Sequence, residues 1–78
     1  MSSKYQYHGI DITPETYEKI VEVVGMIADR DGLTFDEAYL RFASSRVYAS
    51  LENTATMMWS ESAGYITDDY YREMEKQP

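Results

Sequence analysis

Apolar residues recur at intervals of three or four along most of the chain, and short polar stretches separate these runs. Such spacing places apolar side chains on one face of an α-helix. The first run predicts a helix from residue 13 to about residue 31, with Thr13 as its N-cap and Pro14 in its first turn. The stripe of this helix comprises Tyr17, Ile20, Val21, Val24, Ile27 and Ala28, widened by Val23. Gly25 in mid-helix costs about 1 kcal/mol relative to alanine, so we expect another helix to approach closely there.

The turn from Gly32 to Glu37 gives the strongest local signal. Glycine readily takes the left-handed conformation that ends a helix. Thr34 and Glu37 have the spacing of a capping box, in which each side chain accepts a hydrogen bond from the other residue's backbone N–H. The sequence therefore predicts a second helix from Phe35 to about Ser44. Its apolar face comprises Phe35, Ala38, Tyr39, Phe42 and Ala43.

Two further helices are predicted after the serine pair at 44–45. Ser45 is placed to cap a helix from Arg46 to about Trp59, in which the Asn53-Thr54 step is the weakest point. After a break at 60–64, the last helix has two distinct faces. Its apolar face carries Tyr65, Ile66, Tyr70 and Met74, and its solvated face carries Asp68, Asp69, Glu73 and Lys76.

Residues 1–12 differ from the rest, because apolar and polar residues alternate there. Tyr5 and Tyr7 share one parity, Ile10 and Ile12 the other, and the change predicts a bulge or kink at Gly9. No second strand is predicted, so this segment should lie as an arm over the helices; the alternative is pairing with the same segment of another subunit. The predicted fold is all-α: a small bundle of three to four short helices at 13–76, with an extended N-terminal arm at 1–12.

Size and charge limit the function classes. A chain of 78 residues has a marginal core, so we expect a homodimer. The net charge of −7 argues against a nucleic-acid surface. No apolar run approaches the roughly 20 residues that span a bilayer, and residues 1–5 lack the apolar core of a secretory signal. We therefore expect a cytoplasmic protein that does not contact membranes.

Candidate reactive groups are sparse. The chain has no cysteine, and its only histidine is His8, which is expected to be exposed in the arm. The segment Asp29–Gly32 is similar to part of a calcium loop, but that alignment places Ile27 and Ala38 at ligand positions. The four glycines are not clustered, which excludes a glycine-rich phosphate loop. We therefore predict no catalytic residue, no metal site and no cofactor, and the chain is not expected to be an enzyme.

Aromatic residues and methionine give the most interaction-like feature. Eight tyrosines are more than a small core encloses, and Tyr, Trp and Met are enriched at protein interfaces. We predict an interface that includes Tyr5, Tyr7, Met57, Trp59 and Tyr71. The alternative is that these aromatic residues, Trp59 above all, fill the core.

Four motifs resemble a group of short uncharacterised bacterial proteins across Tyr17 to Tyr71. They are Gly32-Leu-Thr-x-x-Glu-Ala, Phe42-x-x-Ser45-x-x-Tyr48-x-x-Leu51, Trp59-x-Glu61-Ser62 and Tyr65-Ile66-x-x-x-Tyr70. The chain departs from this group in its tyrosine-rich arm and at Ala63-Gly64, where a proline-containing turn is expected. The resemblance implies a small helical fold without an assigned catalytic residue, and genes that sometimes neighbour predicted toxin genes.

These observations lead to one main functional hypothesis and two alternatives. The main hypothesis is a non-enzymatic protein–protein interaction module of unknown partner, antitoxin-like or adaptor in role. The first alternative is an acidic nucleic-acid mimic or phage-type inhibitor that occupies a basic protein site. The second is a small DNA-binding regulator, which the acidic residues after the turn disfavour.

Overall fold

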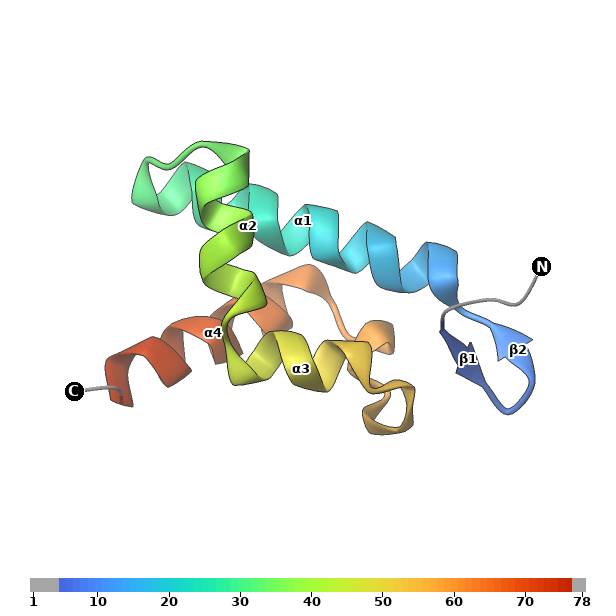
Figure 1. Cartoon of the computed structure of the whole chain (residues 1–78). Helices are drawn as coiled ribbons and strands as arrows, with labels where there is room; N and C mark the ends of the chain where they lie inside the picture. Colours follow the sequence, from blue (N-terminus) through green and yellow to red (C-terminus); the bar gives the residue numbers. More distant parts are fainter. Residues whose placement is uncertain (1–4, 77–78) are drawn as a thin grey trace.

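The computed structural model describes residues 5–76, which form a small all-α bundle with a short hairpin at its N-terminal end (Figure 1). The predicted fold class is confirmed. The elements are β1 (Gln6–Tyr7), β2 (Ile10–Asp11), α1 (Thr13–Asp31), α2 (Phe35–Ala43), α3 (Arg46–Glu52), the 3-10 turns η1 (Thr54–Thr56) and η2 (Met58–Ser60), and α4 (Ala63–Lys76). Residues 1–4 of the predicted arm lie outside the described residues.

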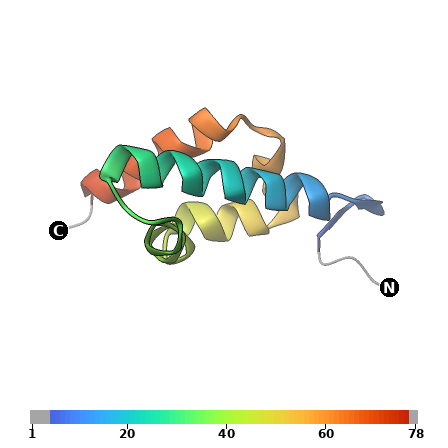
Figure 2. The same ribbon diagram turned by 90° about the horizontal axis from the view of Figure 1, so that it is seen from above.

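Helix α1 organises the bundle, because α2 and α4 both pack against it. Viewed from above, α1 lies in front, with α4 on one side of it and α3 on the other (Figure 2). In this view α2 is seen nearly end-on. The core contains Ile20, Val23, Val24 and Ile27 of α1, Ala38 and Phe42 of α2, Val47 and Leu51 of α3, and Ala63, Ile66 and Tyr70 of α4. No helix in the described part of the chain is long and apolar enough to cross a membrane.

The N-terminal segment pairs with itself, so the prediction of a strand without an intrachain partner is wrong. Gln6 pairs with Asp11 and Tyr7 with Ile10 in antiparallel register. His8 and Gly9 between them both have positive φ, +50° and +80°. Two consecutive positive φ values characterise the tight turn whose twist matches a β-hairpin. The parity change at Gly9 therefore marks a turn rather than a bulge.

The start of α1 joins the hairpin to the bundle, and the prediction that Thr13 caps the helix is wrong. The Thr13 N–H donates to Asp11 Oδ1 at 2.9 Å. The Thr13 hydroxyl instead accepts from the Tyr5 N–H at 3.1 Å and donates to the Tyr5 carbonyl at 3.3 Å. The helix thus receives its first capping contact from Asp11, which frees the Thr13 hydroxyl to hold the hairpin.

The predicted turn between α1 and α2 is confirmed. Gly32 adopts the left-handed conformation with φ +66°, and both its N–H and that of Leu33 donate to the Ala28 carbonyl. Thr34 and Glu37 form the capping box. The Thr34 N–H donates to Glu37 Oε1 at 2.9 Å, and the Glu37 N–H donates to Thr34 Oγ1 at 3.1 Å. The hydrogen bonds from Thr34 lower the pKa of the Glu37 carboxyl. These contacts fix the point where α1 stops and α2 begins.

Helix α3 is shorter than predicted. Ser45 caps it as expected, because its Oγ accepts from the Tyr48 N–H at 3.1 Å. The helix ends at Glu52, where the Asn53-Thr54 step was the expected weak point. Asn53 Oδ1 accepts from the Ala55 N–H at 3.1 Å, which starts η1. The asparagine side chain thus competes with the helical backbone and redirects the chain.

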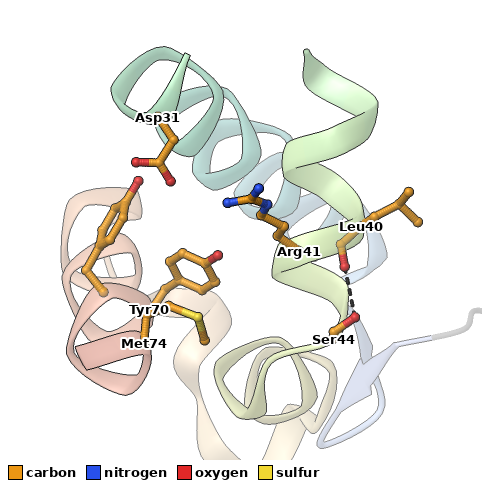
Figure 3. A pocket seen from close by; sticks show the side chains of 7 residues that line it. Asp31, Leu40, Arg41, Ser44, Tyr70 and Met74 are labelled. Carbon is orange, nitrogen blue, oxygen red and sulfur yellow. Dashed lines mark hydrogen bonds between the residues drawn. The ribbon is translucent and has the colours of Figure 1, made fainter. Parts of the chain in front are cut away.

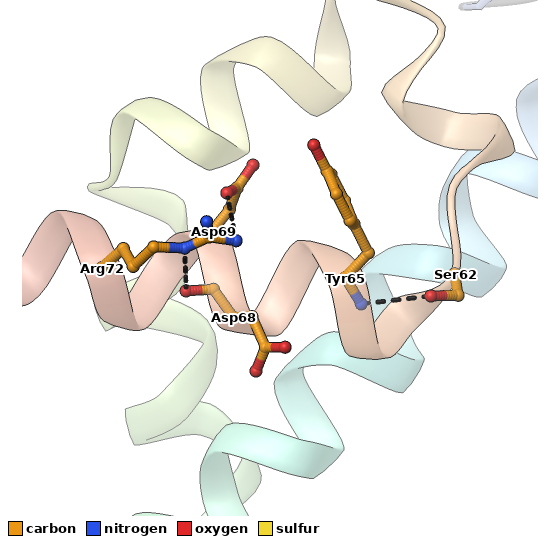
Figure 4. A network of polar contacts seen from close by, with 5 residues as sticks. All are labelled: Ser62, Tyr65, Asp68, Asp69 and Arg72. Atoms are coloured by element: carbon orange, nitrogen blue, oxygen red, sulfur yellow. Dashed lines mark hydrogen bonds and ion pairs between the residues drawn. The ribbon is translucent and has the colours of Figure 1, made fainter.

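On the predicted apolar face of α4, Ile66 and Tyr70 are buried and Met74 is partly buried, but Tyr65 is 48% exposed. The polar face is only partly solvated. Ser62 Oγ accepts from the Tyr65 N–H at 3.1 Å, and Arg72 pairs with Asp69 at 3.0 Å (Figure 4). Glu73, predicted to be solvated, instead accepts hydrogen bonds from α3. Its Oε2 lies 2.9 Å from the backbone nitrogen of Arg46, and its Oε1 lies 3.1 Å from that of Val47.

Glu73 therefore caps a helix distant in sequence, because the first N–H groups of a helix have no intrahelical acceptor. We predict that Glu73→Ala lowers the free energy of unfolding by about 1 kcal/mol, the usual effect of losing an N-cap. Glu75→Ala, an exposed glutamate on the same helix, is the matched control and should change it by less than about 0.5 kcal/mol. Urea unfolding followed by circular dichroism measures both, and equal values would contradict the capping role.

The prediction that another helix approaches Gly25 is wrong. Apart from its chain neighbours and the adjacent backbone of α1, no described atom lies within 4 Å of the position that a Cβ would take there. We therefore predict that Gly25→Ala raises the free energy of unfolding by about 1 kcal/mol, the difference in helix propensity. Gly32→Ala should lower it by about 1 kcal/mol or more, because alanine is strained at positive φ. Urea denaturation of both variants tests this, and a destabilised Gly25→Ala variant would contradict it.

Candidate functional site

Three of the five predicted interface residues come together at the hairpin end. The ring centroids of Tyr7 and Trp59 are 5.4 Å apart, and the Tyr7 hydroxyl lies 3.3 Å from Met57 Sδ. Trp59 is half-buried, and its Nε1 donates to the Thr54 carbonyl at 3.0 Å. Met57 is exposed and adopts a positive φ of +58°. Tyr7 and Trp59 therefore pack the hairpin against the turns that follow α3.

Tyr5, which directly precedes β1, is buried. Its hydroxyl donates a hydrogen bond to Glu52 Oε2, and its ring packs edge-on against Tyr17 with centroids 5.7 Å apart. Burial, and then the hydrogen bond and negative charge of Glu52, raise the pKa of Tyr5. Tyr5 thus fastens the hairpin to the end of α3 instead of lying on an accessible surface.

Tyr71, the fifth predicted residue, lies with α4 near the C-terminal end of α1, away from the hairpin. It lines an open cavity of about 560 Å³ together with Asp31, Leu40, Arg41, Ser44, Tyr70 and Met74. Figure 3 shows the Arg41 guanidinium pointing into this cavity, with Asp31 above it and Tyr70 opposite. Met57 and Tyr71 therefore do not belong to one surface.

The environment of Tyr71 is partly charged. The Arg30 guanidinium carbon lies 3.9 Å from the centroid of the Tyr71 ring, a cation–π contact. Burial raises the pKa of Tyr71 to about 12, with a further contribution from the Asp31 carboxylate. The buried Tyr71 hydroxyl nevertheless has no well-formed hydrogen bond to any described residue.

The cavity offers polar contacts without a paired nucleophile and base among its lining residues. The Ser44 hydroxyl donates to the Leu40 carbonyl at 3.0 Å, and none of the lining residues is a histidine or lysine (Figure 3). His8, exposed at the opposite end, contacts Tyr7 with ring centroids 4.3 Å apart. Residues 5–76 contain no group of three His, Asp or Glu side chains arranged to hold a metal ion.

A second surface is formed by large apolar side chains that the core does not cover. Tyr17 and Val21 of α1 are 48% and 57% exposed, and Phe35 and Tyr39 of α2 are 47% and 37% exposed. We call these four residues the α1–α2 apolar face. Each helix contributes residues four apart, which are neighbours on a helix surface.

Neighbouring aromatic residues place the two halves of this face on the same side of the bundle. Tyr17 packs against the Tyr5 ring, and both Tyr17 and Tyr39 are close enough to add to the raised pKa of Tyr5. Tyr39 also lies edge-on to Tyr48 of α3, with centroids 6.3 Å apart. The face therefore lies on the α3 side of α1, opposite α4, and Figure 2 shows these sides separated by α1.

The sequence prediction assigned these four residues to the apolar stripes of their helices. The positions follow helical spacing, but the stripes are broader than the core that the neighbouring helices cover. Val24 and Ala38 are fully buried, whereas Val21 and Phe35 at the edges are about half exposed. Stripe width was the available signal, because an unusually wide apolar stripe indicates surface that another element must cover.

No protein family model, curated protein or solved structure matches this chain. The site is therefore interpreted from its own geometry.

The tyrosines predict a stability change in alkali. A raised pKa means that the folded state favours the neutral phenol, so this stabilisation is complete below the unfolded pKa of about 10. It is then lost as pH rises toward the folded value, which is about 12 for Tyr71. We predict that the free energy of unfolding falls between these pH values and that Tyr71→Phe reduces the fall. Urea unfolding across this range measures it, and a flat profile would contradict the prediction.

Proposed function

We propose that this chain is a non-enzymatic protein–protein interaction module that binds another protein through the α1–α2 apolar face. The observation that carries the proposal is the exposure of four large apolar side chains, Tyr17, Val21, Phe35 and Tyr39, on adjoining helices. Large apolar side chains that gather in water on one side of a folded protein mark an interaction site.

The physical reason is the cost of leaving apolar surface in water. Full burial of one large apolar side chain contributes about 1.5–3 kcal/mol, and these side chains are roughly half exposed. Each would therefore contribute on the order of 1 kcal/mol when a partner covers it. Two tyrosines and a phenylalanine are also suited to the centre of an interface, because they bury large areas with few rotatable bonds.

The predicted residues of the hairpin contribute indirectly. Tyr5 and Tyr7 hold the hairpin against the bundle, and Tyr5 supports the ring of Tyr17 from below. Met57 adds an exposed apolar side chain at the hairpin end. The antitoxin-like or adaptor role that the resemblance implies would be one form of this binding function.

An acidic mimic that occupies a basic site is the second candidate, favoured by the net charge of −7. A mimic binds through carboxylates, so its affinity falls steeply with salt and does not require the apolar face. An interaction module depends on the apolar side chains. Variants of the face therefore separate the two functions.

The test is a capture experiment from extracts of the source cells, read out by quantitative mass spectrometry. We predict that a specific protein is retained by the wild type and lost, by about tenfold or more, from the Val21→Ser/Phe35→Ser variant. The matched control is Leu40→Ser, because Leu40 is 66% exposed but lines the cavity of Tyr71 instead of the face.

Circular dichroism must show equal helix content in all three proteins. A partner retained equally by the face variant and the wild type would contradict binding through this face. If such a partner were also released by moderate salt, the acidic mimic would be the better account.

A further inference from the structure

The charges around the α1–α2 apolar face are negative. Glu18 lies three residues before Val21 on α1, and Glu22 continues the same edge one turn later. On α2, Asp36 lies three residues before Tyr39. All three carboxylates are exposed, and none has a hydrogen bond or ion pair to another described residue.

The positive charges lie elsewhere on the bundle. The six within residues 5–76 are Lys19, Arg30, Arg41, Arg46, Arg72 and Lys76. Arg30 stacks on Tyr71, Arg72 pairs with Asp69, and Arg41 lines the cavity beside α4.

The other three cations also lie away from the face. Lys19 precedes Met26 by seven residues, and Met26 faces α4 through a 3.5 Å contact with Thr67. Helical spacing puts Lys19 on this α4 flank. Arg46 begins α3 where Glu73 of α4 caps it, and Lys76 ends α4. Lys19 lies three residues before Glu22 and partly offsets its charge, whereas Glu18 and Asp36 have no lysine or arginine three or four residues away on their own helices.

This charge pattern disfavours a second copy of the chain as the occupant. A two-fold interface places the same surface on both sides, so the carboxylates of Glu18, Glu22 and Asp36 would face a second set of the same carboxylates. Like charges opposed across an interface weaken association, whereas opposite charges strengthen it and speed encounter. The expected homodimer would have to use another surface.

The shape of the face favours a helical partner. Each half of the face presents side chains four residues apart. Side chains at this spacing form a ridge that packs into the groove of another helix. Helix-in-groove binding uses apolar anchors at this spacing and charged residues along the flanks.

Building on the function proposed above, we infer that the face binds a partner helix whose apolar stripe is flanked by lysine or arginine. The apolar side chains of that helix cover Tyr17, Val21, Phe35 and Tyr39. Its cations approach Glu18 and Glu22 along α1 and Asp36 on α2.

The experiment uses the full chain and three labelled synthetic peptides of about 18 residues, long enough for five helical turns. The first has a leucine stripe with lysine flanks, the second the same stripe with glutamate flanks, and the third lysine flanks with glutamine in place of leucine. Fluorescence anisotropy measures the Kd of each. Light scattering measures the mass of the chain alone.

We expect the leucine–lysine peptide to bind at least about tenfold more tightly than either other peptide. Its affinity should fall at least about tenfold between roughly 50 and 500 mM salt. Val21→Ser/Phe35→Ser should weaken it about tenfold or more, while Leu40→Ser should stay within about twofold. Glu18→Lys/Glu22→Lys should shift the preference toward the glutamate peptide.

Four results would overturn the inference, and they bear differently on the proposed function. Equal binding of the two leucine peptides, still lost in Val21→Ser/Phe35→Ser, would reject a basic partner and leave the face as a binding site. Equal binding of both lysine peptides would indicate charge alone, as in an acidic mimic. A dimer that Val21→Ser/Phe35→Ser dissociates would make a second copy the occupant. Binding of no peptide would also reject the basic helix, and the capture experiment would then decide the proposed function independently.

Discussion

The turn between α1 and α2 determines the rest of the bundle. Gly32 ends α1 in a left-handed conformation, and the Thr34–Glu37 capping box starts α2 two residues later. These local hydrogen bonds fix where the chain leaves one helix and enters the next. With the turn in place, Ala38 and Phe42 reach the core that Val24 and Ile27 begin. The same geometry puts Phe35 and Tyr39 on the side that Tyr17 and Val21 occupy.

The apolar face follows from this arrangement, because the described helices leave large apolar side chains on one flank of α1 exposed. Helix α4 covers one flank, with Thr67 near Met26 and Tyr71 beneath Arg30. On the other flank, α3 ends at Glu52, and Tyr5 packs edge-on against Tyr17. The edges of the α1 and α2 stripes remain in water. This exposed remainder, bordered by carboxylates, is the basis of both functional proposals.

Local sequence signals predicted the structure well where the deciding contacts were local. The left-handed Gly32, the capping box and the Ser45 cap depend on residues within a few positions of one another. The errors have two sources, which are contacts between distant segments and local elements too short to show a pattern. Glu73 looked solvated because Arg46, whose N–H it binds, is 27 residues away. The hairpin was missed because each strand has only two residues, too few for alternation to appear. Helical spacing likewise identified the apolar stripes of α1 and α2. It could not show how much of each stripe other elements cover, because that depends on how α3 and the hairpin pack.

The exposure of the apolar face in the free chain is the central claim, and NMR with a soluble paramagnetic gadolinium chelate measures it most directly. The chelate broadens signals from side chains that it can approach. We predict strong broadening for the Val21 methyls and the Phe35 and Tyr39 rings, similar to that of Leu40, and little for Ile27 and Phe42. If Val21 and Phe35 were as protected as the core residues in a monomeric sample, the face would already be covered, and the account would be contradicted.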